Sequence, residues 1–303
     1  MKFSKEILFK RFDIRSAETA QKAFIHMSTG EKSVFFVFVF LMIFSVALML
    51  GKINSYISIE KPKAGGELVE GVIGFPRFVN PLLASSEADR DLVALVYSGL
   101  MKATTEGLFI PDIASSYTLS ENGLEYTFTI KDDVFFHDGT PVTSDDVIFT
   151  INKTKDSSIK SPKRANWEGV SVEKINDKQV VFILKEPYVP FIENTTLGIL
   201  PKHIWGNINS EQFAFSNFNT MPIGSGPYMV NSVKRNSSGI PELYSLQSFN
   251  KYALGTPYIK KLTLHFFSNE KTLVNSFNNG NITSINSISL IHRTHRTTIG
   301  SGV

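Results

Sequence analysis

The fold of this chain is decided by residues 111–150, PDIASSYTLSENGLEYTFTIKDDVFFHDGTPVTSDDVIFT. Within them, LEYTFTI alternates apolar and polar residues, which predicts a half-buried strand. The Asp138-Gly139 pair that follows predicts a tight turn. Thr143 and Asp146 have the spacing of a capping box, so a helix is expected to begin there. A strand, a turn and a helix therefore follow one another in this segment.

Similar signals continue on both sides of this segment. Upstream, ELVEGVIG has strand character, and Ser86 with Asp89 predicts a capped helix that ends near Gly99. Downstream, residues 170–184 predict a hairpin around Asn176-Asp177. Further strands are expected at PYMVNSV, LYSLQSF and KLTLHFF, followed by a short helix closed by Gly280. Because strands and helices mix without regular alternation, a mixed α/β fold of the α+β kind is expected.

An extreme apolar stretch lies near the start of the chain. From Val34 to Leu50 every residue is apolar except Ser45, and a helix without a polar face is typical of a membrane span. Residues 33–51 are therefore expected to be a transmembrane signal anchor, with a cleaved signal peptide as the alternative. Residues 1–32 hold seven Lys and Arg against four acids, which predicts a basic cytoplasmic tail. A single-pass protein of the cell membrane, with its main domain on the periplasmic or extracellular side, would result.

Composition excludes several classes of function. The 303 residues are 42% hydrophobic and 19% charged, which excludes disorder throughout the chain. The absence of cysteine excludes disulfides, thiolate metal sites and cysteine nucleophiles. Beyond residue 32 the basic and acidic residues balance, so a nucleic-acid partner is not expected. No hydrolase, metalloprotease or dinucleotide motif occurs, so we expect neither an enzyme nor a metal or cofactor.

Three short motifs that suggest chemistry are better explained structurally. His137 and Asp138 are adjacent, so on a strand they would point to opposite faces and form a poor catalytic pair. Asp145-Asp146 lies in the first turn of the predicted helix, where acids favour the helix dipole. GSGP at 224–227 leads into a strand, whereas a phosphate loop needs Lys-Ser/Thr and a helix.

Several motifs, taken in order, resemble the extracellular solute-binding proteins of the peptide/nickel class. These proteins serve ABC importers and include the oligopeptide- and dipeptide-binding proteins. The resemblance covers about 66–285, and its string FHDGTPVTSDDV is highly specific. Besides residues 111–150, the motifs that carry it are FVNPLLASSEADRD (78–91), LVYSGLM (95–101), LPKHIW (200–205), GSGPYMV (224–230) and NKYALGTPYIKKLTLHFF (250–267).

The resemblance implies a periplasmic-binding-protein-like fold, in which two α/β lobes close over a ligand. A domain is inserted into the first lobe of such proteins. Here the first lobe would comprise 65–85 and 186–285, with 86–185 as the inserted domain and 52–64 as a linker to the membrane. Family members usually continue with a second lobe, whereas residues 286–303 look like a non-family tail. The second lobe is therefore expected to be missing, through a truncated or frameshifted reading frame.

The function implied is that of a membrane-anchored binding component of an ABC-type peptide importer. It would capture extracytoplasmic oligopeptides and work with permease and ATPase subunits, although nickel chelates, sugars and opines use the same scaffold. The alternative is a non-transport envelope interaction module that keeps only the first lobe. Ligands of α/β lobes lie at strand ends, so the expected ligand-binding residues follow the first strand: Phe75, Arg77, Phe78 and Asn80. A surface role for Arg77 and a turn-shaping role for Asn80 remain the alternatives.

Overall fold

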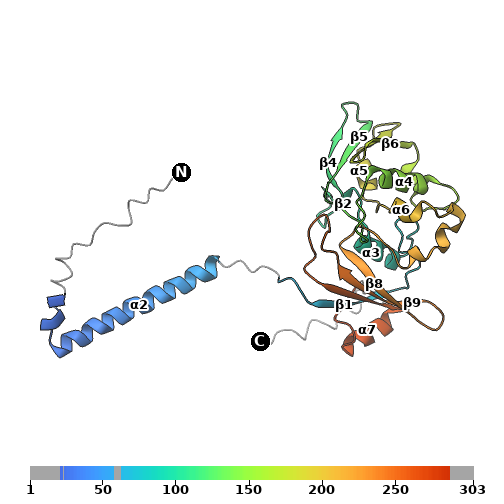
Figure 1. Ribbon diagram of the computed structural model, residues 1–303. Helices are drawn as coiled ribbons and strands as arrows, with labels where there is room; N and C mark the ends of the chain where they lie inside the picture. Colours follow the sequence, from blue (N-terminus) through green and yellow to red (C-terminus); the bar gives the residue numbers. More distant parts are fainter. Residues whose placement is uncertain (1–20, 23, 58–62, 287–303) are drawn as a thin grey trace. The chain divides into compact units, whose positions relative to one another are not determined.

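A computed structural model describes residues 21–22, 24–57 and 63–286 of the chain (Figure 1). The chain divides into two compact units, Met1–Pro62 and Lys63–Val303. Most of the expected cytoplasmic tail, the middle of the linker and nearly all of the expected tail after residue 285 lie outside the described residues. The two units are described separately below.

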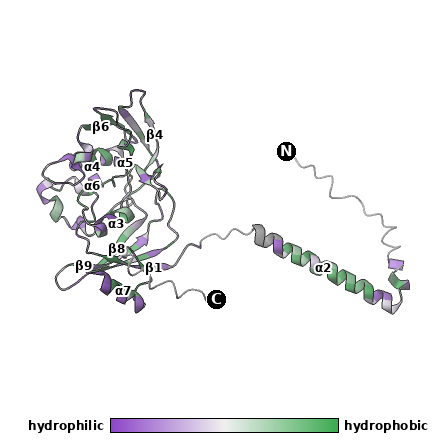
Figure 2. Ribbon diagram, turned by 180° about the vertical axis from the view of Figure 1, so that it is seen from behind, coloured by the Kyte–Doolittle hydropathy of each residue, from purple (hydrophilic) through white to green (hydrophobic). Residues whose placement is uncertain are grey.

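In the first unit, helix α2 (Thr29–Ile57) is apolar at every position from Val34 to Leu50 except Ser45, and Figure 2 shows this middle part as hydrophobic. The most apolar stretch of 18 residues within Thr29–Lys52 has a mean hydropathy of 2.8, and none of that stretch is buried. A helix of this length and composition can cross a membrane, although a signal sequence meets the same criterion. The helix that the sequence predicts at 33–51 is therefore present and longer at both ends.

In the second unit, a five-stranded sheet has the strand order β11-β1-β10-β9-β8. Strand β1 lies between β10 and β11 and is parallel to both, whereas β9 is antiparallel to β10 and β8. The bounds are β1 Glu67–Ile73, β8 Tyr228–Arg235, β9 Pro241–Ser248, β10 Lys261–Phe267 and β11 Ser284–Ile285, with helices α3 Glu87–Val96, α6 Lys202–Trp205 and α7 Glu270–Asn278 and the 3-10 turns η3 Ser210–Phe215 and η4 Asn217–Asn219. The three strands predicted at 227–267 and the helix before Gly280 are thereby confirmed.

A second, antiparallel sheet is built from the middle of the chain, in the order β4-β5-β7-β6. It lies at the opposite end of the unit from β1 and α7 (Figure 1). The bounds are β4 Ala114–Leu119, β5 Glu125–Ile130, β6 Val170–Asn176 and β7 Gln179–Leu184, with the small hairpin β2 Met101–Ala103 and β3 Phe109–Pro111, helices α4 Ser144–Lys155 and α5 Phe191–Asn194, and the turn η2 Arg164–Trp167. The predicted strand at 124–130 and the hairpin at 170–184 are confirmed.

Each sheet has its own hydrophobic core. Phe128, Phe182 and Trp167 belong to the core of the four-stranded sheet, and Tyr244 and Trp205 to that of the five-stranded sheet. Helix α3 packs in the five-stranded core through its apolar face, Ala88, Leu92 and Val96. The division expected at 85/86 and 185/186 does not coincide with these cores. The core residues up to Tyr97 and from Leu200 onward belong to the core of the five-stranded sheet, and those from Leu100 to Ile199 belong to the core of the four-stranded sheet. Ile159 is the exception, because it packs in the core of the five-stranded sheet.

The predicted helix starts are confirmed, but one predicted helix end is wrong. Both capping boxes are present, Ser86 with Asp89 on α3 and Thr143 with Asp146 on α4. Helix α3 ends at Val96, so Gly99 does not close it. A Cβ at Gly99 would lie 2.6 Å from the backbone of Thr196, so this glycine allows two chain segments to pass closely instead.

Candidate functional site

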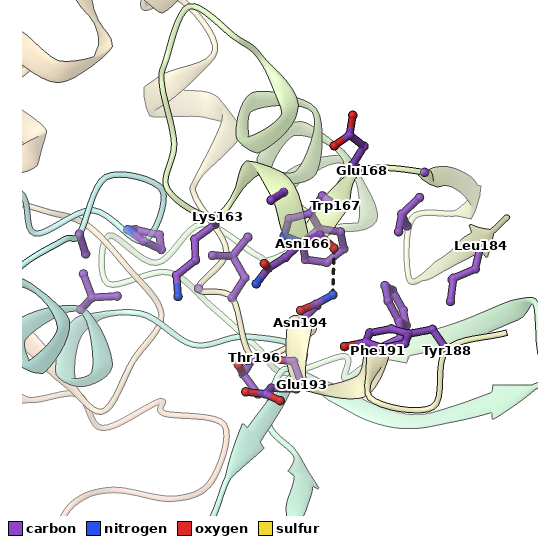
Figure 3. Close-up of a pocket in the computed structure, with 18 of the residues that line it drawn as sticks. Lys163, Asn166, Trp167, Glu168, Leu184, Tyr188, Phe191, Glu193, Asn194 and Thr196 are labelled. Atoms are coloured by element: carbon purple, nitrogen blue, oxygen red, sulfur yellow. Dashed lines mark hydrogen bonds between the residues drawn. The ribbon is translucent and has the colours of Figure 1, made fainter. Parts of the chain in front are cut away.

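A cavity of about 950 Å³ opens beside α3 and is the candidate ligand site (Figure 3). Its walls come from the turn after β1, from α3, from η2 with the start of β6, and from the segment that joins β7 to α5 and continues beyond it. Both hydrophobic cores thus contribute residues to one pocket. Its volume is in the range of sites that bind small ligands.

Hydrogen bonds between loops fix the wall around Lys163 and Asn166. The Ser161 hydroxyl donates to the Leu82 carbonyl at 2.6 Å, and the Lys163 amide donates to the Ser161 hydroxyl at 3.2 Å. On the other side, the Asn194 side-chain amide donates to the Asn166 carbonyl at 2.9 Å (dashed in Figure 3). Residues 161–167 are therefore attached both to the turn after β1 and to α5.

Six charged side chains line the pocket, three of each sign: Arg90, Lys163, Lys185, Glu168, Glu186 and Glu193. None of them belongs to an ion pair within the described part of the chain. Arg90 makes one hydrogen bond, from Nη1 to the Ser85 carbonyl at 2.6 Å. Exposed charges without ion pairs are available to a ligand that carries both an amine and a carboxylate.

The residues that the sequence predicts as ligand contacts lie next to this pocket but do not line it. The backbone amides of Arg77 and Phe78 both donate to Oδ1 of Asp89, at 2.7 and 3.0 Å. Oδ2 of Asp89 accepts from the amides of Ser85 and Ser86, at 3.3 and 3.1 Å. The loop after β1 is therefore folded around one buried carboxylate.

Within this loop the four predicted residues differ in exposure. Asn80 is completely buried, donates to Asn219 Oδ1 at 2.9 Å and accepts from the Leu82 amide at 2.9 Å. It therefore shapes the turn. Arg77 is exposed and its guanidinium lies 5.5 Å from the centre of the Phe78 ring, while Phe75 is half-buried. A ligand role for Phe75, Arg77 and Phe78 stays a prediction, and Pro81 and Ala84 are the residues of this loop that reach the pocket.

Beside the pocket, the FHDG and GSGP motifs meet the end of α3. We call residues 96–98, 136–138 and 224–226 the junction. The His137 amide donates to the Gly224 carbonyl at 2.8 Å, and its Nδ1 accepts from the Gly224 amide at 3.3 Å. Nε2 lies 3.1 Å from the Gly226 carbonyl. Burial lowers the pKa of His137 to about 4, so the ring is neutral and Nε2 donates.

The junction also explains the two glycines of GSGP, because a Cβ at Gly224 would collide with the Val96 carbonyl oxygen. The Gly226 amide donates to the Val96 carbonyl at 2.8 Å, and a Cβ at Gly226 would lie 2.5 Å from the Val96 carbonyl carbon. Asp138 contacts His203 instead of His137, with Oδ2 2.7 Å from Nε2. The prediction that His137 and Asp138 do not form a pair is confirmed.

The pocket residues beyond α3 were missed from sequence because no recognisable motif contains them. The sequence does offer one indication of this wall: residues 160–169, between α4 and β6, are mostly polar but contain Trp167, which the structure shows to be buried. Among the residues that the structure describes, no group of three or more His, Asp or Glu side chains is placed to hold a metal ion.

A pocket that is lined by loops and lies between two hydrophobic cores is the kind of site that binds a small ligand. The chain belongs to the bacterial extracellular solute-binding proteins of family 5, whose middle region matches residues 109–294. The family that the sequence motifs indicated is thereby confirmed. The matched range extends past residue 286, so the boundary of the expected tail stays a prediction.

Individual relatives agree with this assignment. The oligopeptide-binding protein AppA of Bacillus subtilis is 34% identical over 76% of this chain and 42% of its own length. The probable peptide-binding protein YejA of Agrobacterium fabrum is 30% identical over 75% of this chain and 38% of its own length.

Solved structures show the same fold. AppA of Bacillus subtilis in complex with a nonapeptide matches with a TM-score of 0.72 at 32% identity, over 78% of this chain and 47% of AppA. NikZ of Campylobacter jejuni in complex with Ni(L-His) matches with a TM-score of 0.67 at 29% identity, over 79% of this chain and 46% of NikZ. The chain spans less than half the length of the relatives it matches.

Proposed function

We propose that this chain provides the first lobe of the substrate-binding component of an ABC-type peptide importer. The observation that carries the proposal is the pocket beside α3, with unpaired charges of both signs. A peptide carries an amine and a carboxylate and can use such charges together with exposed backbone groups. The similarity to AppA, whose structure was solved in complex with a nonapeptide, supports this ligand class over the nickel chelate of NikZ.

In this proposal the first lobe binds peptide by itself, and a second lobe covers the bound peptide. The relatives are more than twice as long as the region they share with this chain, so the remainder of such a protein would cover the ligand from the other side. The permease and ATPase subunits of the importer are the partners proposed. The expected frameshift or truncation is tested by reading the coding sequence after Val303 for a frame that encodes a second lobe.

Peptide binding is tested with the full chain in lipid nanodiscs. Fluorescence anisotropy of labelled nonapeptides should report saturable binding that unlabelled peptide displaces. Ala94→Trp, which enlarges an exposed α3 residue in the pocket wall, should weaken binding at least tenfold. Ala103→Trp on β2 is the matched control, because Ala103 is exposed and lies outside the pocket. No binding to any peptide would contradict the proposal and favour the envelope interaction module.

We also propose that α2 anchors the binding lobe at the outer face of the cell membrane. Its apolar surface and the excess of Lys and Arg before it support this orientation. The chain has no cysteine, so single cysteines can report topology without background. A membrane-impermeant maleimide should label Ser115→Cys in intact cells and should not label Lys22→Cys. Labelling of Lys22→Cys, or release of the lobe into the medium, would contradict a signal anchor.

A further inference from the structure

The two ends of the pocket differ in chemistry. At one end, Arg90 donates to the Ser85 carbonyl and Ser161 donates to the Leu82 carbonyl, so Arg90 and the Lys163 segment both lie against residues 82–85. At the other end lie the side chains of Leu184, Tyr188 and Phe191, on the opposite side of Asn166 and Asn194 from Lys163 (Figure 3). Lys185 and Glu186, which follow Leu184 in the chain, also line the pocket and add one charge of each sign. The cavity therefore has a cationic end and an end that is mainly apolar and aromatic.

The cationic end offers positive charge that the fold does not use. Lys163 is exposed, and its ammonium has no ion pair within the described residues. Arg90 gives one donor to a backbone carbonyl, and a guanidinium has five. The carboxylate of Glu168, although it belongs to the lining, points away from Lys163 in Figure 3. A ligand carboxylate can therefore contact Lys163 and the remaining donors of Arg90.

The apolar end combines a buried aromatic residue, Phe191, with an exposed one, Tyr188. Phe191 is completely buried and packs against Tyr126 and Trp167, with ring centres 4.9 and 5.8 Å apart. Tyr188 is 53% exposed, and the Tyr126 hydroxyl donates to its carbonyl at 3.4 Å. An exposed tyrosine on a fixed backbone can cover an apolar ligand side chain at a small entropic cost.

We infer that this pocket selects peptide segments that carry a carboxylate at one end and an apolar or aromatic side chain at the other. The inference rests on the proposed function and deepens it by naming the peptide class. Lys163, assisted by Arg90, determines the preference for the carboxylate, and Tyr188 the preference for the apolar side chain.

The test uses the full chain in nanodiscs and a panel of alanine nonapeptides that carry one Phe and one Glu. The two residues are separated by one to four positions in both orders, because an extended peptide advances about 3.3 Å per residue. For the tightest member, Glu is then replaced by Gln, and separately Phe by Ala. The wild-type chain should bind the Gln and Ala peptides about fivefold more weakly, the scale of one exposed charge contact or one partly covered side chain.

Variants assign each preference to its residue. Lys163→Gln should reduce the Glu-over-Gln preference to less than twofold and leave the Phe-over-Ala preference in place, and Tyr188→Ala should do the reverse. Lys234→Gln, which replaces an exposed lysine on β8 outside the pocket, should change neither preference. Glu193→Gln should keep the preference for Glu.

The outcomes separate this inference from the proposed function. Equal affinity of the wild-type chain for the Glu and Gln peptides, or an unchanged preference in Lys163→Gln, would overturn the inference while peptide binding itself stands. Failure of the wild-type chain to bind any member of the panel would overturn both. Circular dichroism of each variant shows whether it is folded. Lys163→Gln should fold normally, because the hydrogen bond that Lys163 makes to Ser161 uses its backbone amide and is kept in the variant.

Discussion

The junction and the pocket lie side by side and use polar side chains in opposite ways. In the adjacent loop Asp89 is buried, at the junction His137 is half-buried, and backbone amides and carbonyls satisfy both side chains. In the pocket, Lys163 and Glu193 are exposed and have no ion pairs within the described residues. The first two side chains stabilise the fold, whereas the second two remain available to a ligand. Substitutions in the first set should therefore change stability, and those in the second set should change affinity.

The largest effect is expected for Asp89→Ala. The substitution leaves four backbone amides of the loop after β1, those of Arg77, Phe78, Ser85 and Ser86, without their acceptor. We expect a loss of about 4 kcal/mol in the free energy of unfolding, measured by urea denaturation. Asp89→Asn, which keeps one acceptor oxygen, should lose less. An Asp89→Ala chain of wild-type stability would remove the distinction between the two regions.

A large effect is also expected when the pH is lowered through the range in which histidine titrates. The pKa of His137 is about 4 in the folded chain, below its ordinary value of 6.5, because burial disfavours the charged ring. The unfolded chain therefore binds the proton first. The stabilisation is complete above pH 6.5 and is lost as the pH falls towards 4, by about 3 kcal/mol in total.

The measurement is the urea midpoint between pH 4 and pH 7, compared between the wild-type chain and His137→Gln. Other groups titrate in both chains, so the difference between the two curves isolates His137. The difference should shrink as the pH falls. Parallel curves would show that His137 is not held neutral at the junction.

A smaller loss is expected from Gly226→Ala. The new methyl group would lie 2.5 Å from the Val96 carbonyl carbon and 2.7 Å from the Tyr97 amide nitrogen, so the end of α3 must move. Overpacking of this kind costs about 2 kcal/mol. The matched control is Ser225→Ala, because the buried Ser225 hydroxyl has no hydrogen-bond partner within the described structure and its loss should be nearly neutral. Thermal unfolding followed by circular dichroism would measure both, and equal midpoints would contradict the close approach.

The smallest effect on stability is expected in the pocket. Lys163→Gln and Glu193→Gln replace exposed groups without ion pairs, so their unfolding midpoints should match the wild type. Differential scanning calorimetry of the two variants and the wild-type chain checks this directly. A clear drop in either variant would mean that the fold uses the pocket charges after all.

Local signals in the sequence predicted most of the fold. The capping boxes at Ser86 and Thr143 and the alternation in β5 depend on residues close together in the chain, so they were confirmed. The contact between His137 and Gly226 joins residues 89 positions apart, and neither motif alone indicates the other. The domain boundaries expected at 85/86 and 185/186 stay a prediction, and the change of core after Tyr97 could not be read from the sequence, because the apolar face of α3 does not say which sheet it covers.

The candidate site was less predictable, for a physical reason. A loop after a strand is a sound place to expect ligand contacts, and Pro81 and Ala84 do reach the pocket. The loop that contains Phe75 to Asn80 instead folds around the Asp89 carboxylate, which accepts four backbone hydrogen bonds. These hydrogen bonds form only in the folded loop, so the sequence does not reveal them. Lys163 and Tyr188 belong to segments without regular secondary structure, and only the tertiary fold brings them to one cavity.

Amide hydrogen exchange tests the central claim most directly, that the pocket beside α3 is where this chain binds a peptide. The full chain in nanodiscs is compared with and without saturating nonapeptide, and exchange is followed by mass spectrometry. Protection is expected in residues 163–170 and 184–198 and around α3, the segments that line the cavity. Protection confined to other parts of the lobe, or none at peptide concentrations that saturate binding, would contradict the account.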